Sequence, residues 1–318
     1  MSILCAIWQT ETAAFSRNVF DITTRIGTSA LEEIIMPQKT LNSAVVCTGI
    51  SLHAGTQVSM EFKPAPVDTG IVFHVHADDG EHLLQLRPEA VSTTELATTI
   101  SDGKVSVSTI EHVLSSLRAL DIDNVEIHVV GCEVPLLDGS AKLIVEALDK
   151  AGIVEQDAPR RMLKAVKPFM LEKDGKSIAV EPYDGFRVDY TIRFPHPVIG
   201  EQRFVLDVTP GSFREQIANA RTFGFFREAE YLRSKGLARG CSLDNVIVID
   251  DNGVMNEGGL RFPDEFVRHK ILDFIGDMAM LGRPMLGAFT VACSGHAHNN
   301  AFLRQLVQIE GALAPVES

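Results

Sequence analysis

The sequence has little of several features that mark particular classes of protein. Lys and Arg number 29 against 42 Asp and Glu, giving a net charge of −13 over 318 residues. This balance argues against a nucleic-acid binder, because neutralising phosphates requires clustered cations. No stretch approaches the roughly 18 consecutive apolar residues of a membrane helix, so we expect no integral membrane segment.

Cysteine is scarce and shows no motif spacing. The five cysteines form no C-x-x-C pair and are odd in number, which favours free thiols in a reducing compartment. The first residues also lack the basic start and long apolar run of a secretory signal. Together these features predict a cytoplasmic protein, and we expect a monomer.

Nucleotide-binding loops are largely missing as well. Gly175-Lys176-Ser177 imitates the end of a P-loop, but Met170 stands where that loop requires its earlier glycine. No G-x-G-x-x-G follows a predicted strand. The sequence therefore disfavours a dinucleotide-binding or ATP-hydrolysing fold.

The length suggests two domains of roughly 150 residues each. Regular patterning begins only after Met36, so residues 1–36 are an extension, the product of a start placed too early, or an ordinary arm that packs on the body. Beyond them we expect a first α+β domain at 37–158, a second at 159–312 and a tail at 313–318. Strands and helices segregate within each half and do not alternate as a regular βαβ series, so the predicted fold class is α+β.

Periodicity places the individual elements. Helices are predicted at residues 108–120, 141–150, 212–219, 227–234 and 264–281. Strands are predicted at 58–63, 125–130, 162–172, 176–182, 186–194 and 246–250. The polar stretch 154–161, which contains Pro159, is predicted to be a linker.

Three residues together can make a metal site. His269 and Asp273 are four positions apart in a strong helical pattern, so both side chains project from one face. His112 lies far upstream, directly after Glu111. Two imidazoles and one carboxylate would leave the fourth zinc position open for water, and Glu111 could take a proton from that water.

Each of these residues also has an ordinary structural interpretation. A His-x3-Asp pair on a helix is common by chance, and Glu111 has the spacing of a capping-box partner of Ser108. Asp277 continues the polar stripe of the helix as an orienting acceptor or as a solvated carboxylate. In the loop at 295–300, one histidine could donate a proton or the segment could only cap a helix. His74, His76 and His82 resemble a metal tract, but their polar, strand-then-turn setting favours an exposed hairpin.

The motifs as a set resemble one family closely, the UDP-3-O-acyl-N-acetylglucosamine deacetylases of lipid A biosynthesis. The resemblance runs in order from about residue 39 to about residue 306. It is carried by residues 48–55 (TGISLHAG), 108–112 (STIEH), 134–141 (VPLLDGSA), 221–225 (RTFGF), the 264–277 helix and 295–300 (GHAHNN).

The resemblance implies a zinc hydrolase that removes acetate from UDP-3-O-(3-hydroxyacyl)-N-acetylglucosamine. It implies two similar sheet-plus-helix domains, each with a small insert, with the active site between them. Residues 223–252 would then contain the insert that forms the acyl-chain passage.

The resemblance also assigns roles to individual positions. The zinc ligands would be His112, His269 and Asp273. The general base would be Glu111 and the general acid His296, oriented by Asp277, while Thr222 would help to polarise the carbonyl. Residues expected near the substrate are Lys270 and Lys176 at the diphosphate, Phe194 at uracil, Phe223 at the sugar and Cys241 in the acyl passage.

Three positions depart from the family pattern. Cys241 replaces a small residue, commonly glycine, so we expect a narrower or shorter acyl passage. His298 stands where an apolar residue is common, and Ser51 replaces a usual glycine. Two other hypotheses remain open: a different zinc amidohydrolase or peptidase, which would not need Lys176, Phe194 or an acyl passage, and a non-catalytic protein with a structural metal.

Overall fold

The computed structural model describes residues 36–316. The predictions for the N-terminal extension therefore lie outside the described residues, apart from Met36 itself. The described residues group as a single unit by their contacts.

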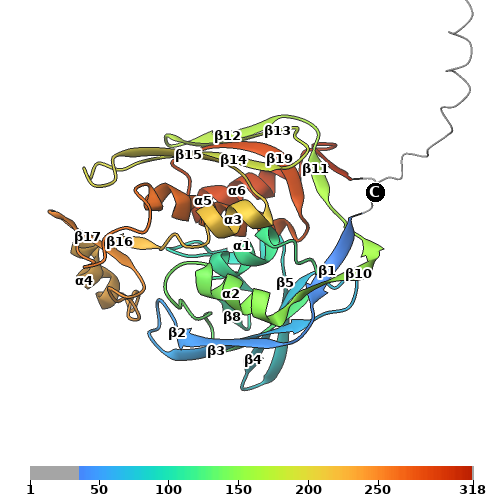
Figure 1. The fold of residues 1–318 in the computed structure, drawn as a ribbon, viewed down its shortest axis with the longest axis horizontal. Coiled ribbons are helices and arrows are strands. Elements are labelled where there is room, and N and C mark those ends of the chain that lie inside the picture. Colours follow the sequence, from blue (N-terminus) through green and yellow to red (C-terminus); the bar gives the residue numbers. More distant parts are fainter. Residues whose placement is uncertain (1–35, 317–318) are drawn as a thin grey trace, which may run out of the picture. The chain divides into compact units, whose positions relative to one another are not determined.

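The first half of the described chain builds a five-stranded sheet of order β2-β3-β9-β4-β5. Its strands are Val45–Ile50 (β2), Gln57–Pro64 (β3), Ile71–Ala77 (β4), Gly80–Gln85 (β5) and Val125–Val130 (β9). Successive side chains of a strand point to opposite faces, and Phe62, Phe73 and Ile127 are fully buried on the inner face. Helices α1 (Glu111–Ala119) and α2 (Lys142–Ala151) lie over that face (Figure 1).

The second half builds a seven-stranded sheet in which β19 is paired with β11, β13 and β14. Its strands are Leu163–Ala165 (β11), Phe169–Lys173 (β12), Lys176–Glu181 (β13), Phe186–Arg193 (β14), Glu201–Asp207 (β15), Met285–Ala292 (β19) and Leu313–Pro315 (β20). Its inner face is covered by α3 (Pro210–Gln216), α5 (Glu265–Met278) and α6 (His296–Leu306) (Figure 1). A 3-10 turn at Ala279–Leu281 continues α5.

The helices other than α4 lie between the two sheets, so the core has four layers (Figure 1). Helices α1 and α5 pack directly on each other at the middle of this arrangement. Eight of the nine residues of α1 and twelve of the fourteen of α5 are buried. Polar side chains on these two helices therefore face protein and not bulk water, which matters for the site.

Three smaller sheets complete the fold. Strands β1 (Pro37–Leu41) and β10 (Ile153–Pro159) pair with each other. A 3-10 turn at Pro88–Ala90 precedes a three-stranded sheet of Val91–Thr93 (β6), Thr99–Ser101 (β7) and Ser106–Val107 (β8). The third small sheet contains Phe223–Phe225 (β16), Ile247–Asp250 (β17) and Gly253–Val254 (β18). Helix α4 (Phe226–Ser234) follows β16 in the chain and precedes β17.

The predicted fold class is confirmed, because helices and strands segregate as α+β. The predicted linker at 154–161 is wrong, because β10 occupies most of it and pairs with β1. The predicted tail is wrong at Leu313–Pro315, which adds to the large sheet beside β11. Both segments are short, so their sequence gives no sign of the distant partner that supplies their hydrogen bonds. The domain boundaries stay a prediction.

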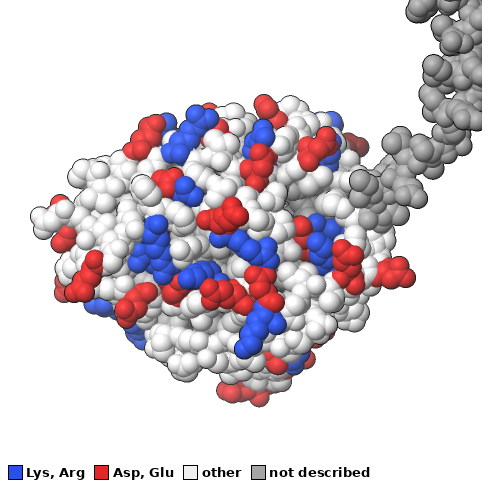
Figure 2. Space-filling view, viewed as in Figure 1, with Lys and Arg blue, Asp and Glu red and all other residues white. Residues whose placement is uncertain are grey.

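Two surface features complete this description. None of the helices in the described part of the chain is long and apolar enough to cross a membrane. On one face of the molecule, Lys and Arg side chains lie interspersed with Asp and Glu (Figure 2).

Candidate metal centre and substrate cavity

The site begins with an unusually close approach of α1 and α5. A Cβ built on Gly276 of α5 would lie 2.0 Å from the carbonyl oxygen of Glu111, the first residue of α1. Only glycine leaves room for backbones at this separation. The contact brings Glu111 and His112 against the polar stripe of α5.

His112, His269 and Asp273 meet at this contact. Their ligand atoms lie within 4.8 Å of one another, and all three residues are buried. Asp273 Oδ1 is 3.6 Å from His112 Nε2 and 3.3 Å from His269 Nε2. The two imidazole rings stand nearly perpendicular, with centroids 5.0 Å apart. Three potential ligand atoms therefore converge where α1 packs on α5.

The state of these side chains fits a cation. Asp273 Oδ1 is buried and accepts no hydrogen bond from the described residues, an arrangement that is costly unless a positive charge lies nearby. The Nδ1 of His269 lies 3.1 Å from the carbonyl oxygen of Ala220, so donation to that oxygen leaves Nε2 free as a ligand. Burial lowers the pKa of His269 to about 3, which keeps the imidazole neutral. The donor set therefore suits a divalent transition metal.

Lys270 contacts the same group through its ammonium. Its Nζ donates to Asp273 Oδ2 at 2.6 Å, the carboxylate oxygen that does not face the histidines. Burial by itself would raise the pKa of Asp273, but His269 and Lys270 hold it well below its ordinary value. Asp273 is therefore an ionised carboxylate.

Glu111 lies beside this group and is not a helix cap. Its Oε2 accepts a hydrogen bond from the backbone of Thr98 at 3.0 Å, while α1 has no side-chain cap at its N-terminus. The capping-box interpretation is wrong, because Ser108 lies outside the helix and accepts from Thr99. Burial raises the pKa of the Glu111 carboxyl.

His296, the first residue of α6, lies between Glu111 and Asp277. Its Nε2 is 4.0 Å from Glu111 Oε1, and its Nδ1 is 2.8 Å from Asp277 Oδ2. Burial alone would lower the pKa of His296, but the Asp277 carboxylate raises it to about 9. Asp277 is itself held by Thr98 Oγ1 at 2.6 Å and by the Asn299 amide at 2.7 Å. Asp277 is therefore buried and specifically bonded, so the solvated-carboxylate interpretation is wrong.

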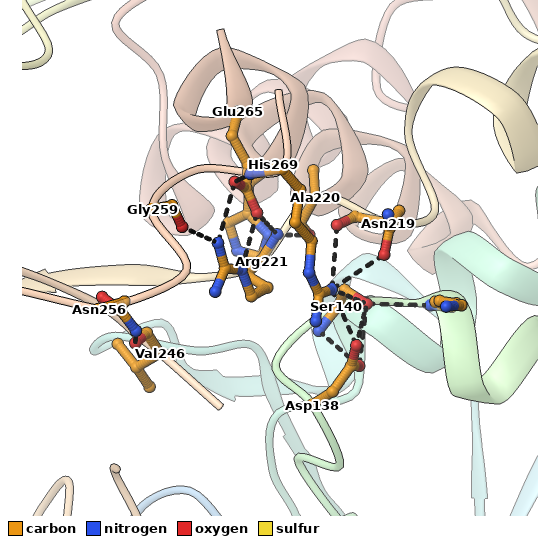
Figure 3. A network of polar contacts seen from close by, with 12 residues as sticks. Asp138, Ser140, Asn219, Ala220, Arg221, Val246, Asn256, Gly259, Glu265 and His269 are labelled. Atoms are coloured by element: carbon orange, nitrogen blue, oxygen red, sulfur yellow. Dashed lines mark hydrogen bonds and ion pairs between the residues drawn. The ribbon is translucent and has the colours of Figure 1, made fainter. Parts of the chain in front are cut away.

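A polar network fixes the segment beneath His269 (Figure 3). Arg221 Nε donates to Glu265 Oε1 at 3.0 Å, and the Arg221 backbone donates to the same oxygen at 2.9 Å. Because Glu265 is the first residue of α5, this buried pair ties residues 220–222 to the helix that carries His269. The carbonyl of Ala220 is thereby positioned at His269 Nδ1.

The converging side chains open into a cavity of about 580 Å³. Its apolar arm is lined by Ala229 and Leu232 of α4, by Val246 and Val248 around β17, and by Cys241. Burial raises the pKa of the Cys241 thiol to about 11, so this side chain is a neutral, space-filling group. The predicted passage segment at 223–252 thus lines a cavity that reaches the candidate metal centre.

The other residues predicted to act in catalysis or substrate binding also lie at this cavity, with one exception. Its walls include Lys176, Phe194, Thr222, Phe223 and Lys270. Asp277 does not line it and lies behind His296. Phe194 and Phe223 meet edge to face with ring centroids 5.6 Å apart. Lys176 is exposed on β13, whereas Lys270 is already paired with Asp273.

Sequence reasoning missed Thr98 and Asn299. Thr98 contacts both Glu111 and Asp277, and Asn299 holds Asp277 from α6. The run at residues 97–100 carries no motif that could identify Thr98. Asn299 lies in the 295–300 segment, three residues after His296. This spacing on a helix could have indicated an amide near the same site.

This arrangement defines the chain as an α+β protein with a buried candidate metal centre that opens on a deep, partly apolar cavity. The family model for UDP-3-O-acyl N-acetylglycosamine deacetylase matches residues 38–308, and the chain belongs to that family.

Individual relatives support the assignment. The chain is 54% identical to the UDP-3-O-acyl-N-acetylglucosamine deacetylase of Oleidesulfovibrio alaskensis over 275 residues, 86% of this chain and 90% of that protein. It is 54% identical to the protein of the same name from Nitratidesulfovibrio vulgaris over 271 residues, 85% of this chain and 88% of that protein. Identity to a protein of that name from Neisseria meningitidis is 45% over 287 residues, 89% of this chain and 94% of that protein.

Proposed function

We propose that this protein hydrolyses the N-acetyl group of UDP-3-O-(3-hydroxyacyl)-N-acetylglucosamine, an early step in lipid A biosynthesis, in the cytoplasm. The observation that carries the proposal is the meeting of the three-ligand group with Glu111 and His296 in the wall of a cavity that apolar side chains of α4 and β17 also line. Membership of the deacetylase family supports the choice of substrate.

The proposed cofactor is zinc, held by His112, His269 and Asp273. Two imidazoles and one carboxylate are the ligand set of an open catalytic site, whereas a structural zinc site normally uses four protein ligands. When bound there, zinc would lower the pKa of a water molecule and polarise the amide carbonyl. This assignment is supported by Asp273 Oδ1, which is buried and accepts no hydrogen bond within residues 36–316.

Glu111 is proposed as the general base. Its Oε2 is occupied by the Thr98 backbone, which leaves Oε1 available to take a proton from the attacking water. The pKa raised by burial brings the carboxylate closer to the neutral range in which proton transfer is efficient.

His296 is proposed as the general acid. An amide nitrogen leaves poorly until it is protonated, so the step needs a proton donor near neutral pH. Asp277 holds His296 in the cationic form through Nδ1, and Nε2 faces the side of the site occupied by Glu111. The hydroxyl of Thr222 is proposed to stabilise the developing negative charge on the carbonyl oxygen.

The cavity walls suggest how the substrate would lie. The apolar arm at α4 and β17 suits a fatty acyl chain, with Cys241 limiting its width. We assign Phe194 to stacking near uracil, Phe223 to the sugar, and Lys176 and Lys270 to the diphosphate. A hydrolase that acts on a substrate without an acyl chain would not need the apolar arm, which favours the deacetylase over other zinc amidohydrolases.

The decisive experiment measures acetate release from the UDP-linked acylated sugar by the purified full chain. We expect turnover with the metal in place, loss of turnover with a chelator, and recovery when zinc is restored. A matched substrate without the acyl chain should be processed far more slowly. A zinc-loaded, folded protein that releases no acetate would contradict the proposal.

A further inference from the structure

A cluster of histidines lies on the outer face of the five-stranded sheet. His74 and His76 stand two residues apart on β4, so both point to the same face. The alternate residues Phe73 and Val75 are buried in the core. The outward face of β4 therefore presents two imidazoles.

Sheet register brings two more ligand-type side chains beside them. His128 of β9 is the parallel neighbour of His74, and Glu81 of β5 is the antiparallel neighbour of His76. His82, which the sequence groups with His74 and His76, pairs with Val75 and contacts Asp79 and Asp102. The β4–β5 hairpin is confirmed, but the histidine set is different, with His128 in place of His82.

Three of these side chains, His74, His128 and Glu81, offer ligand atoms that all lie within 4.8 Å of one another. Glu81 Oε1 is 3.2 Å from His74 Nδ1 and 3.7 Å from His128 Nδ1. His76 stands beside this group, with its Nε2 3.7 Å from Glu81 Oε1 and 3.2 Å from His128 Nδ1. Ligand atoms bound tetrahedrally to one zinc ion at about 2.1 Å stand about 3.4 Å apart. The distances from Glu81 Oε1 to the three nitrogens bracket that value, and His76 must move toward His74 to share the ion.

The surroundings also favour a cation. Glu126 Oε2 lies 3.6 Å from His128 Nε2, and Glu61 is the cross-strand neighbour of His128. Lys63, the nearby cation, lies 3.3 Å from Glu61. His74 Nδ1, the nitrogen nearest Glu81 Oε1, is buried and makes no hydrogen bond of normal geometry with the described residues. The cluster thus combines carboxylates with a buried nitrogen that the described part of the protein leaves available.

We propose that His74, His76, His128 and Glu81 form a second divalent-metal site, separate from the candidate catalytic centre. Imidazole with carboxylate suits zinc, cobalt, nickel or copper and not magnesium or calcium. None of the four residues lines the large cavity. Binding there would join β4, β5 and β9 across their outer face.

The rings must reorient slightly to bind. His74 and His128 are stacked with centroids 4.3 Å apart, and His76 and His128 are stacked at 5.4 Å. A shared ion requires these rings to tilt so that their lone pairs point to one centre. The side chain of His76 is 43% exposed and that of Glu81 44%, so the cluster has open space for this movement.

The test is a metal titration of the full chain prepared with one zinc ion per chain. Zinc is added alone, binding is followed by calorimetry, and bound metal is measured after dialysis. We expect the wild-type protein to take up a second equivalent. We expect His74→Ala/His128→Ala to lose that uptake, with second-site affinity reduced at least about tenfold. Glu81→Gln, at an exposed position, should weaken it without affecting folding.

The matched control is His82→Ala, which removes an imidazole from the same hairpin but from its other face. This variant should bind the second ion as the wild type does. Circular dichroism and thermal melting confirm that each variant is folded. Absence of a second equivalent in the wild type, equal binding by the double variant, or loss of binding in the His82→Ala control would each overturn the proposal.

Discussion

The α-carbon of Gly276 faces the carbonyl oxygen of Glu111 so closely that a Cβ added to this glycine would come within 2.0 Å of it. Gly276 lies on α5 between Asp273 and Asp277, and Glu111 opens α1. This one contact therefore sets the distance between the helix that carries His112 and the helix that carries His269. The precision of the candidate metal centre depends on it.

Gly276→Ala should destabilise the fold and disturb the site. Alanine is the better helix former by about 1 kcal/mol, but the added methyl group would meet backbone atoms that cannot rotate away. Overpacking of this kind costs about 1–3 kcal/mol or more, so we expect a net loss of stability together with weaker metal binding. Urea unfolding and a zinc competition titration measure the two effects.

Gly258→Ala is the matched control for that variant. A Cβ at Gly258 would meet no atom within 4 Å, so its stability should stay within about 0.5 kcal/mol of wild type. Wild-type stability and metal affinity in Gly276→Ala would show that the α1–α5 spacing is not critical.

Glu111→Ala should abolish most turnover and leave the metal in place. Loss of a general base costs about 10²-fold or more in kcat, whereas the three proposed ligands are untouched. The measurement combines steady-state kinetics with metal analysis of the purified variant. Turnover close to that of the wild type would rule out Glu111 as the base.

The rate should depend on pH through two groups of opposite protonation. Glu111 must be ionised, so activity falls as the pH drops through a pKa that burial raises above the ordinary glutamate value. His296 must be protonated, so activity falls as the pH rises through about 9. We expect a bell-shaped profile of kcat/KM against pH, because kcat/KM reports the pKa values of the free enzyme.

Asp277→Asn tests the origin of the alkaline limb. Removing a charge 2.8 Å from His296 Nδ1 should lower the pKa of the imidazole by about one unit or more. The alkaline limb should therefore move to lower pH while the acidic limb moves little. An alkaline limb at the wild-type position would contradict the role assigned to Asp277.

Cys241→Gly should shift the preferred acyl length upward. The thiol lines the apolar arm of the cavity and is neutral, so its removal mainly adds space. The measurement is kcat/KM across a series of acyl lengths, with Cys132→Ser as a control because Cys132 is exposed. Equal length preference in Cys241→Gly and wild type would dismiss the idea that this residue limits the passage.

The sequence predicted the fold class and one part of the geometry of the candidate site. Helical spacing alone places His269 and Asp273 on one face, and the structure confirms that their nitrogen and oxygen atoms are 3.3 Å apart. His112 comes close to His269 and Asp273 only because α1 packs on α5, and no local sequence pattern shows that packing. For this step the resemblance of the motifs to a known family supplied what periodicity could not.

Short elements whose partners are distant in sequence could not be predicted. Ile153–Pro159 has three consecutive polar residues at its centre and ends in a proline, yet it forms a strand because β1 supplies its hydrogen bonds. Thr98 escaped notice for a related reason. Its importance comes only from its contacts with Glu111 and with Asp277, 179 positions away. The role of such a position depends on its tertiary contacts and not on the residues next to it in sequence.

The placement of the proposed ligands has a consequence for biosynthesis of the protein itself. His112 is translated long before His269 and Asp273, so a growing chain on the ribosome holds only one of the three until α5 emerges. Tight capture of an ion at this centre must therefore await synthesis beyond Asp273 and docking of α5 on α1. Occupancy would then distinguish chains that contain α5 from chains that stop before it.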